Sequence, residues 1–208
     1  MNCTKIICIG QNYRAHAKEM NAEPPSEPII FLKPASALIS DGENIEARLD
    51  VGRVDHEVEL ALIMGRRARQ VAEEDALEYI SHLAVFNDIT ARDIQSMARK
   101  DGNPWALAKS MDTFAPMSTP VLFSSVRDIH ELDLRLCVNG DVRQRGNTSH
   151  MIFPPESLIA HISKYITLEE GDIIATCTPE GVGPLNDGDV VTAEISGVGK
   201  ISNRVRRY

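Results

Sequence analysis

Positive charge is in deficit in this sequence: 22 Lys and Arg residues stand against 30 Asp and Glu residues, for a formal net charge of −8. Nucleic acids and anionic membrane surfaces favour basic proteins, so this balance argues against both as partners. An anionic small molecule would need lysines or arginines gathered at one place. The composition therefore predicts a protein without a nucleic-acid or membrane partner.

Cysteine spacing and long apolar runs also exclude several classes of protein. The four cysteines show no C-x-x-C pair or other zinc spacing, and four thiols in 208 residues do not suggest a disulfide scaffold. No apolar run is long enough to span a bilayer, and the N-terminus lacks the basic-then-apolar order of a signal peptide. These absences predict a cytoplasmic protein, and the length fits one domain.

Two acidic residues begin an otherwise apolar segment, Asp55 to Met64. Alternate residues of a strand point to opposite faces, so Glu57 and Glu59 share one side of this segment, and Ala61 follows on the same side. An exposed edge strand with two solvated glutamates is the simpler interpretation, since Glu is mostly exposed. If the pair is buried, something must neutralise it, and both carboxylates can converge on one hard cation.

Asp88 is the third acidic residue of interest, because it follows an apolar strand-like run. An aspartate in that place usually serves a turn or a helix cap. Thr90 with Asp93 resembles a capping box for a helix from Ala91 to Arg99, however, which leaves Asp88 without a structural role.

Several other polar residues lie at positions where they could act together. His16 and Glu19 are three apart on a predicted helix, as a surface ion pair or as a functional pair, and Arg92 and Gln95 have the same spacing. Lys33 ends the apolar strand 29–32, either as a snorkelling cation or as a charge that meets an anion.

The remaining pattern predicts more strands than helices. Alternation over Leu132–Val138 leads into a hairpin turn at Asn139-Gly140. Strands are expected over 190–195 and 200–205, and helices over 73–83 and 155–166. Because strands and helices do not alternate regularly, the expected fold class is α+β with a mixed or antiparallel sheet system.

Several sequence blocks resemble, in order, the fumarylacetoacetate hydrolase family, in particular its small branch of acylpyruvate hydrolases and oxaloacetate decarboxylases. The blocks are Gly10–Tyr13, His16–Met20, Phe31–Pro34, His56–Leu60, Asp88–Gln95, Pro104–Ser110 and Met151–Phe153. The resemblance implies a mixed β-roll or β-sandwich with a few short helices, assembled as a homodimer. It also implies a single catalytic domain over 1–208, in which residues 1–28 include a lid segment.

Carried over position by position, the resemblance implies three groups of site residues. Glu57, Glu59 and Asp88 would bind one Mg²⁺ or Mn²⁺, which agrees with the preference of these metals for hard oxygen ligands. His16 and Glu19 would activate water. The remaining site residues would be Lys109 and Gln95 at the reacting oxygens, with Lys33, Arg92 and Thr178 lining the site.

Two positions depart from the family pattern. Gln11 stands where many relatives carry Arg, which alters a contact to a distal carboxylate. Cys177 replaces the glycine of the usual Thr-Gly-Thr-Pro, either as a packing change or as a side chain that narrows the pocket. If that glycine requires a positive φ, the backbone at Cys177 is strained.

The resemblance implies metal-dependent enolate chemistry on a keto acid. The first expectation is hydrolysis of a carbon–carbon bond in a short acylpyruvate, because His16 and Glu19 are both present. Decarboxylation of oxaloacetate and isomerisation of 2-hydroxyhepta-2,4-diene-1,7-dioate need the same metal ligands and stay open. A metal-stabilised binding protein without turnover is the alternative from another class.

Overall fold

The computed structural model describes residues 3–208; residues 1 and 2, where the predicted domain and lid segment begin, lie outside the described residues. Within that range the α-helices are few and short. They are α1 (Arg14–Glu19), α2 (Arg92–Asp101), α3 (Ala106–Lys109) and α4 (Pro155–Tyr165). Short 3₁₀ segments lie at Ala35–Ala37, Leu49–Val51, Glu73–Tyr79, Phe123–Ser125 and Thr148–His150.

The largest sheet of the described residues has six strands. Its order is β10 (Val121–Leu122), β7 (Ile80–Asn87), β6 (Val58–Met64), β13 (Ile173–Ala175), β1 (Ile6–Gly10) and β2 (Ile29–Lys33). Strands β1 and β13 run parallel, and the other neighbours are antiparallel. Strand β13 comes from late in the chain, so the sheet joins both ends of the sequence.

A five-stranded sheet packs against the first. Its order is β12 (Asp141–Asn147), β11 (Asp133–Val138), β15 (Val190–Ile195), β16 (Gly199–Arg207) and β4 (Asn44–Ala47). The smaller sheets are β14 (Gly183–Pro184), β5 (Val54–His56) and β8 (Thr90–Ala91), and the pair β3 (Leu38–Ile39) and β9 (Ala115–Pro116). The predicted hairpin turn is present: Asn139 and Gly140 both have positive φ, at 53° and 88°.

The hydrophobic core explains why β6 is apolar almost throughout. Val58, Leu60 and Leu62 face a large buried cluster that also contains Leu134 and Val191 from the second sheet. The opposite face of β6 packs in a smaller cluster. Because both faces of the strand are buried, Glu59 is buried within it, and Glu57 just before it keeps only 5% of its surface exposed.

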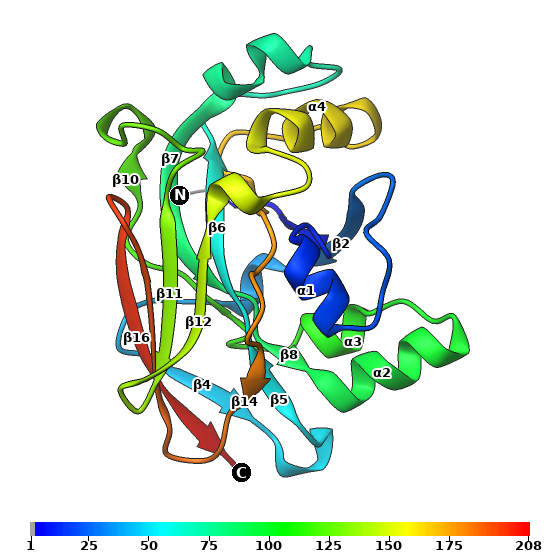
Figure 1. The fold of residues 1–208 in the computed structure, drawn as a ribbon, viewed down its shortest axis with the longest axis vertical. Coiled ribbons are helices and arrows are strands. Elements are labelled where there is room, and N and C mark those ends of the chain that lie inside the picture. The colour runs from blue at the N-terminus through cyan, green and yellow to red at the C-terminus, as the bar shows by residue number, and fades with distance from the viewer. Residues whose placement is uncertain (1–2) are drawn as a thin grey trace.

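The architecture confirms the predicted α+β class with mixed sheets and short helices. Figure 1 shows α1, α2 and α3 gathered on one side of the molecule, away from β11, β12 and β16. Among the described residues, no helix combines the length and the apolar character that a membrane crossing requires.

Two local predictions are wrong. The expected helix over 73–83 is a 3₁₀ segment as far as Tyr79, and Ile80 begins β7. Thr90 is not a helix cap: it lies in β8, its hydroxyl donates to the Asp88 carbonyl, and α2 has no side-chain cap. Pairing of these residues with neighbouring strands outweighed their local helical pattern.

Candidate active site

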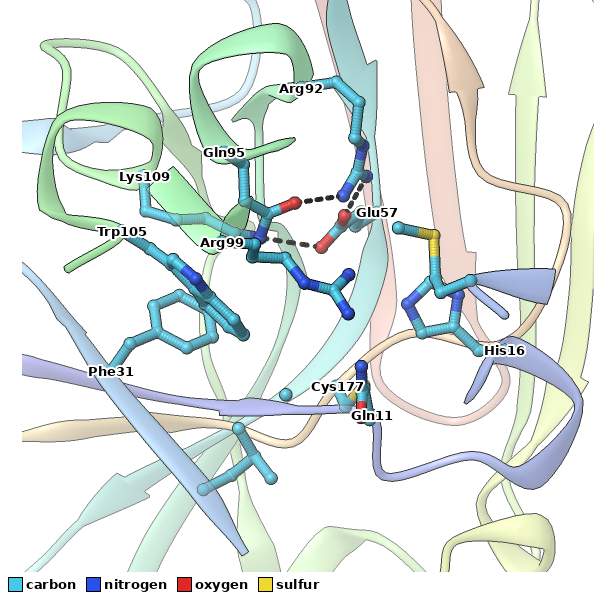
Figure 2. A pocket seen from close by; sticks show the side chains of 13 residues that line it. Gln11, His16, Phe31, Glu57, Arg92, Gln95, Arg99, Trp105, Lys109 and Cys177 are labelled. Atoms are coloured by element: carbon cyan, nitrogen blue, oxygen red, sulfur yellow. Dashed lines mark hydrogen bonds and ion pairs between the residues drawn. The ribbon is translucent and has the colours of Figure 1, made fainter. Parts of the chain in front are cut away.

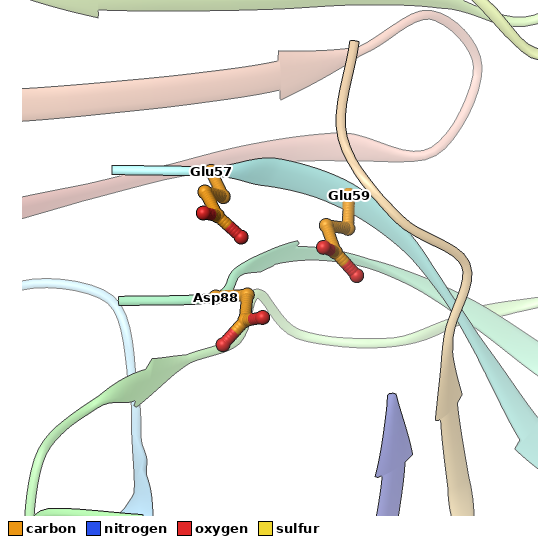
Figure 3. Close-up of side chains that lie close together, drawn as sticks. All are labelled: Glu57, Glu59 and Asp88. Carbon is orange, nitrogen blue, oxygen red and sulfur yellow. The ribbon is translucent and has the colours of Figure 1, made fainter. Parts of the chain in front are cut away.

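Glu57, Glu59 and Asp88 converge at one end of the β6–β7 pair. Val58 pairs with Asn87, so Glu57 and Asp88 lie next to each other across the pair, and the Asp88 amide donates to the Glu57 carbonyl at 2.8 Å. The three residues are buried, and each offers a carboxylate oxygen within 4.8 Å of the others. Figure 3 shows the three side chains turned toward the same space.

Cations surround one side of this cluster. Lys109 Nζ donates to Glu57 Oε2 at 2.9 Å and to Asp88 Oδ2 at 2.5 Å, and Arg92 pairs with Glu57 Oε1. Burial alone raises the pKa of Glu57, but Lys109 and Arg92 outweigh it and hold that pKa well below its ordinary value. Glu57 is therefore ionised, although it is buried.

Glu59 has no ion pair with these cations, and one oxygen of Asp88 accepts no hydrogen bond from them. Burial and the neighbouring carboxylates Asp88 and Glu57 raise the pKa of Glu59 well above its ordinary value. The amide of Cys177 donates to Glu59 Oε2 at 3.0 Å, and Asp88 Oδ1 accepts no hydrogen bond of good geometry although Lys33 Nζ lies 2.7 Å away. Three buried carboxylates with oxygens to spare fit a hard divalent cation.

Arg92 and Gln95 lie side by side on α2, as their spacing predicted. Arg92 donates from Nε to Asp55 at 2.8 Å and from a terminal nitrogen to Gln95 Oε1 at 2.6 Å. Burial lowers the pKa of Arg92, but Glu57 and Asp55 outweigh it and raise that pKa. The guanidinium thus links the acidic cluster to the face of α2.

Lys33 and Thr178 do not line the cavity in front of the cluster. Lys33 Nζ lies behind Asp88 and donates to the carbonyls of Ile89, Lys109 and Phe114. Thr178 is buried, and its hydroxyl accepts a hydrogen bond from Gln144 at 2.8 Å. The structure therefore places both residues outside the wall of this cavity, and their role in substrate binding stays a prediction.

His16 and Glu19 form the predicted pair on α1. The Nδ1 atom of His16 lies 3.1 Å from Glu19 Oε2, and the Gly181 amide donates to Glu19 Oε1 at 3.0 Å. Burial raises the pKa of Glu19, but the hydrogen bond with His16 and the Gly181 amide outweigh it and lower that pKa. Because an ionised carboxylate can only accept, Nδ1 carries the hydrogen and Nε2 is left to accept a proton.

One cavity brings most of these residues together. His16, Glu57, Arg92, Gln95 and Lys109 share its wall, as Figure 2 shows. The wall also contains residues that the sequence did not single out as a group: Ile9, Gly10, Met20, Phe31, Arg99 and Trp105, together with the two departures Gln11 and Cys177. The helical spacing from Arg92 through Gln95 to Arg99 was a signal for Arg99 in the sequence.

The backbone at Cys177 has a positive φ, the case in which the sequence predicted strain at this position. Its φ is 85°, in the left-handed region that favours glycine. The side chain is buried, and its sulfur accepts a hydrogen bond from the Asn12 amide at 3.2 Å. Burial, with the nearby Glu59 carboxylate, raises the pKa of the Cys177 thiol, so the sulfur acts as a packed, neutral group.

This conformation predicts an unusual order of stability between two variants. Cys177→Ala and Cys177→Gly both remove the acceptor for Asn12, which costs about 1–3 kcal/mol. Only glycine relieves the positive φ, so we expect Cys177→Gly to be the more stable variant by about 0.5–1 kcal/mol. Urea unfolding of both variants measures the difference. The same two substitutions at Cys137, within strand β11, should give the ordinary order with alanine more stable; alanine more stable at both positions would contradict the strain.

Comparison with known proteins gives consistent matches over nearly the whole chain. The family model described as fumarylacetoacetate (FAA) hydrolase C-terminal matches residues 5–206. A relative from Arabidopsis thaliana, "Oxaloacetate tautomerase FAHD1, mitochondrial", is 48% identical over 204 residues, covering 98% of this chain and 92% of the relative.

Solved structures agree with that match. Fumarylpyruvate hydrolase from Pseudomonas aeruginosa, in complex with Mn²⁺ and pyruvate, superposes with a TM-score of 0.95 at 32% identity, covering 99% of this chain and 91% of that one. The 2-hydroxyhepta-2,4-diene-1,7-dioate isomerase from Mycobacterium marinum gives 0.87 at 36% identity, with 99% and 75% covered. The family model over residues 5–206 and these similarities show that the chain belongs to the fumarylacetoacetate hydrolase family.

Proposed function

We propose that this protein is a divalent-metal-dependent enzyme that converts a 2-keto acid to its enol or enolate, with the keto–enol tautomerisation of oxaloacetate as its main reaction. The observation that carries the proposal is the placement of the acidic cluster and the His16–Glu19 pair on one cavity. The name of the Arabidopsis relative, at 48% identity, favours oxaloacetate among the keto acids.

Glu57, Glu59 and Asp88 would hold Mg²⁺ or Mn²⁺, and the ion supplies Lewis-acid stabilisation of charge on a keto oxygen. His16 takes a proton from the carbon beside the keto group through Nε2, and the imidazolium returns a proton to the enolate oxygen to complete the enol; the reverse conversion moves the proton back. Glu19 holds the ring and stabilises its charged form. Lys109, with an ammonium inside the cavity, stabilises negative charge on the substrate oxygens. Arg92 orients Gln95 and Glu57.

Hydrolysis of a short acylpyruvate is the second candidate, and the same His16–Glu19 pair supports it. In that reaction His16 takes a proton from water, which attacks the distal carbonyl, and the carbon–carbon bond breaks to leave the enolate of pyruvate. The Pseudomonas aeruginosa structure, a fumarylpyruvate hydrolase with Mn²⁺ and pyruvate, favours this reaction. Decarboxylation of oxaloacetate needs no attacking water, and the heptadienedioate isomerisation needs only proton transfer.

A panel of four substrates tests the proposal: oxaloacetate, acetylpyruvate, fumarylpyruvate and 2-hydroxyhepta-2,4-diene-1,7-dioate. We expect Mg²⁺ or Mn²⁺ to support rapid decay of the oxaloacetate enol absorbance, and chelation of the metal to abolish it. Pyruvate release from oxaloacetate separates decarboxylation from tautomerisation. A protein that is stabilised by the metal but accelerates none of these reactions would be a binding protein, and the proposed activity would be wrong. The homodimer, the single-domain organisation, the lid segment and the cytoplasmic location stay predictions from the sequence.

A further inference from the structure

Arg99 lies on the cavity wall without a partner. It projects from α2 toward the middle of the cavity, on the side that faces Gln11 and His16 (Figure 2). Arg99 is an exposed residue, and none of the ion pairs or side-chain hydrogen bonds found within residues 3–208 involves its guanidinium. In a protein with a net charge of −8, a free cation turned into a cavity is an attractive site for an anion.

The other cations of the same wall are already neutralised. Arg92 pairs with Asp55 and Glu57, and Lys109 pairs with Glu57 and Asp88. The carboxylate end of a keto acid that approaches the acidic cluster would meet these residues and the metal. A second negative charge on the substrate would need a different partner.

Helix geometry places Arg99 further from the acidic cluster than Arg92, which contacts Glu57 directly. Arg92, Gln95 and Arg99 share one face of α2, and seven residues of helix advance about 10 Å along its axis. Long helical side chains lean back toward the helix N-terminus, so the guanidinium of Arg99 reaches over Gln95 toward the cavity. The cavity thus has an acidic, metal-binding inner end and a cationic outer part.

We propose that Arg99 binds the distal carboxylate of a 2-keto dicarboxylate, so that the enzyme selects substrates with a negative charge at both ends. A guanidinium can hold a carboxylate through two parallel hydrogen bonds, which gives both affinity and orientation. Gln11 faces the same space from the other side of the cavity, and its amide can donate to the same group. The inference rests on the proposed function and narrows its substrate class to dicarboxylates such as oxaloacetate and fumarylpyruvate, in preference to acetylpyruvate.

A matched pair of ligands isolates the distal charge. The probes are 2-oxopentanedioate and 2-oxopentanoate, which differ only in the second carboxylate, and their binding to the Mg²⁺-loaded protein is measured by calorimetry. We expect the natural protein to bind the dioate at least about 10-fold more tightly, and Arg99→Met to bring the ratio close to one. Arg99→Lys should keep part of the preference. Lys100→Met removes the same charge from an exposed neighbour outside the cavity and should keep all of it.

Each result separates this inference from the proposed function, because binding is measured without turnover. An Arg99-dependent preference in a protein that accelerates no reaction of the panel supports the dicarboxylate site and overturns the proposed activity. An active enzyme whose ligand ratio is the same in Arg99→Met keeps the activity and overturns the site. Absence of any preference in the natural protein, or equal loss of both ligands in Arg99→Met, also overturns the site.

Discussion

Replacing Lys109 with methionine should lower kcat by about 10²–10³-fold and make the fold dependent on a divalent ion. The rate falls because Lys109 is a buried donor on the cavity wall that contacts both Glu57 and Asp88, and the loss of one such electrostatic stabiliser costs about this much. The fold weakens because Glu57 and Asp88 keep their buried charges and lose a shared cation, which typically costs 3–5 kcal/mol.

Thermal and urea unfolding, each with Mg²⁺ and with a chelator, measure the second effect. The metal should recover much of the stability that Lys109→Met loses, because a divalent ion bound to the folded state neutralises the same carboxylates. Lys100→Met, at an exposed position away from the cavity, is the matched control and should change neither rate nor stability. If Lys109→Met keeps both its rate and its metal-free stability, the contacts of Lys109 with Glu57 and Asp88 contribute neither to catalysis nor to the fold.

Replacing His16 with glutamine should lower kcat by about 10²–10⁴-fold for oxaloacetate tautomerisation and for acylpyruvate cleavage, with little change in the unfolding temperature. His16 is the base of both proposed reactions, and the lost rate is the usual contribution of general-base catalysis. Stability should change little because glutamine can still donate to Glu19. Glu19→Gln should have a smaller effect, since it leaves the imidazole but removes the charge that orients it.

Decarboxylation of oxaloacetate is the control reaction for the His16→Gln prediction. Loss of CO₂ from oxaloacetate needs no base to attack or to remove a carbon-bound proton, so His16→Gln should spare it. His150→Gln, at an exposed histidine outside the cavity, should leave every rate unchanged. A His16→Gln enzyme that tautomerises oxaloacetate at the natural rate would remove His16 from the mechanism.

The parts of the fold that the sequence predicted are those where one local signal dominates. The alternation of Leu132–Val138 and the Asn139-Gly140 turn gave the β11–β12 hairpin, because positive φ at both turn residues suits that dipeptide. The helix predicted over 73–83 was wrong. Ile80 and Leu83 have the spacing of a helix face, but in the structure they belong to a strand that pairs with β6. Only the position of β6 in the sheet decides between the two patterns.

The acidic cluster was predicted from the family resemblance; locally its members stood out only as acidic residues next to apolar strands. Glu57 immediately precedes the apolar strand β6 and Glu59 lies within it, and Asp88 immediately follows β7, the strand that pairs with β6. The surroundings of Lys33 and Arg99, in contrast, could not be predicted from the local sequence. The partners of Lys33 are backbone carbonyls that no sequence pattern reveals, and Arg99 looks like an ordinary surface residue until the fold turns its helix face toward the cavity.

The two oxygens of Glu19 connect His16 to the loop that contains Gly181. One oxygen holds His16, and the other accepts the amide of Gly181, which lies 162 residues further along the chain. Any displacement of α1 that breaks the bond to Gly181 also releases the carboxylate that orients the imidazole. In the proposed mechanism, proton transfer at His16 therefore requires that α1 and the Gly181 loop are in contact.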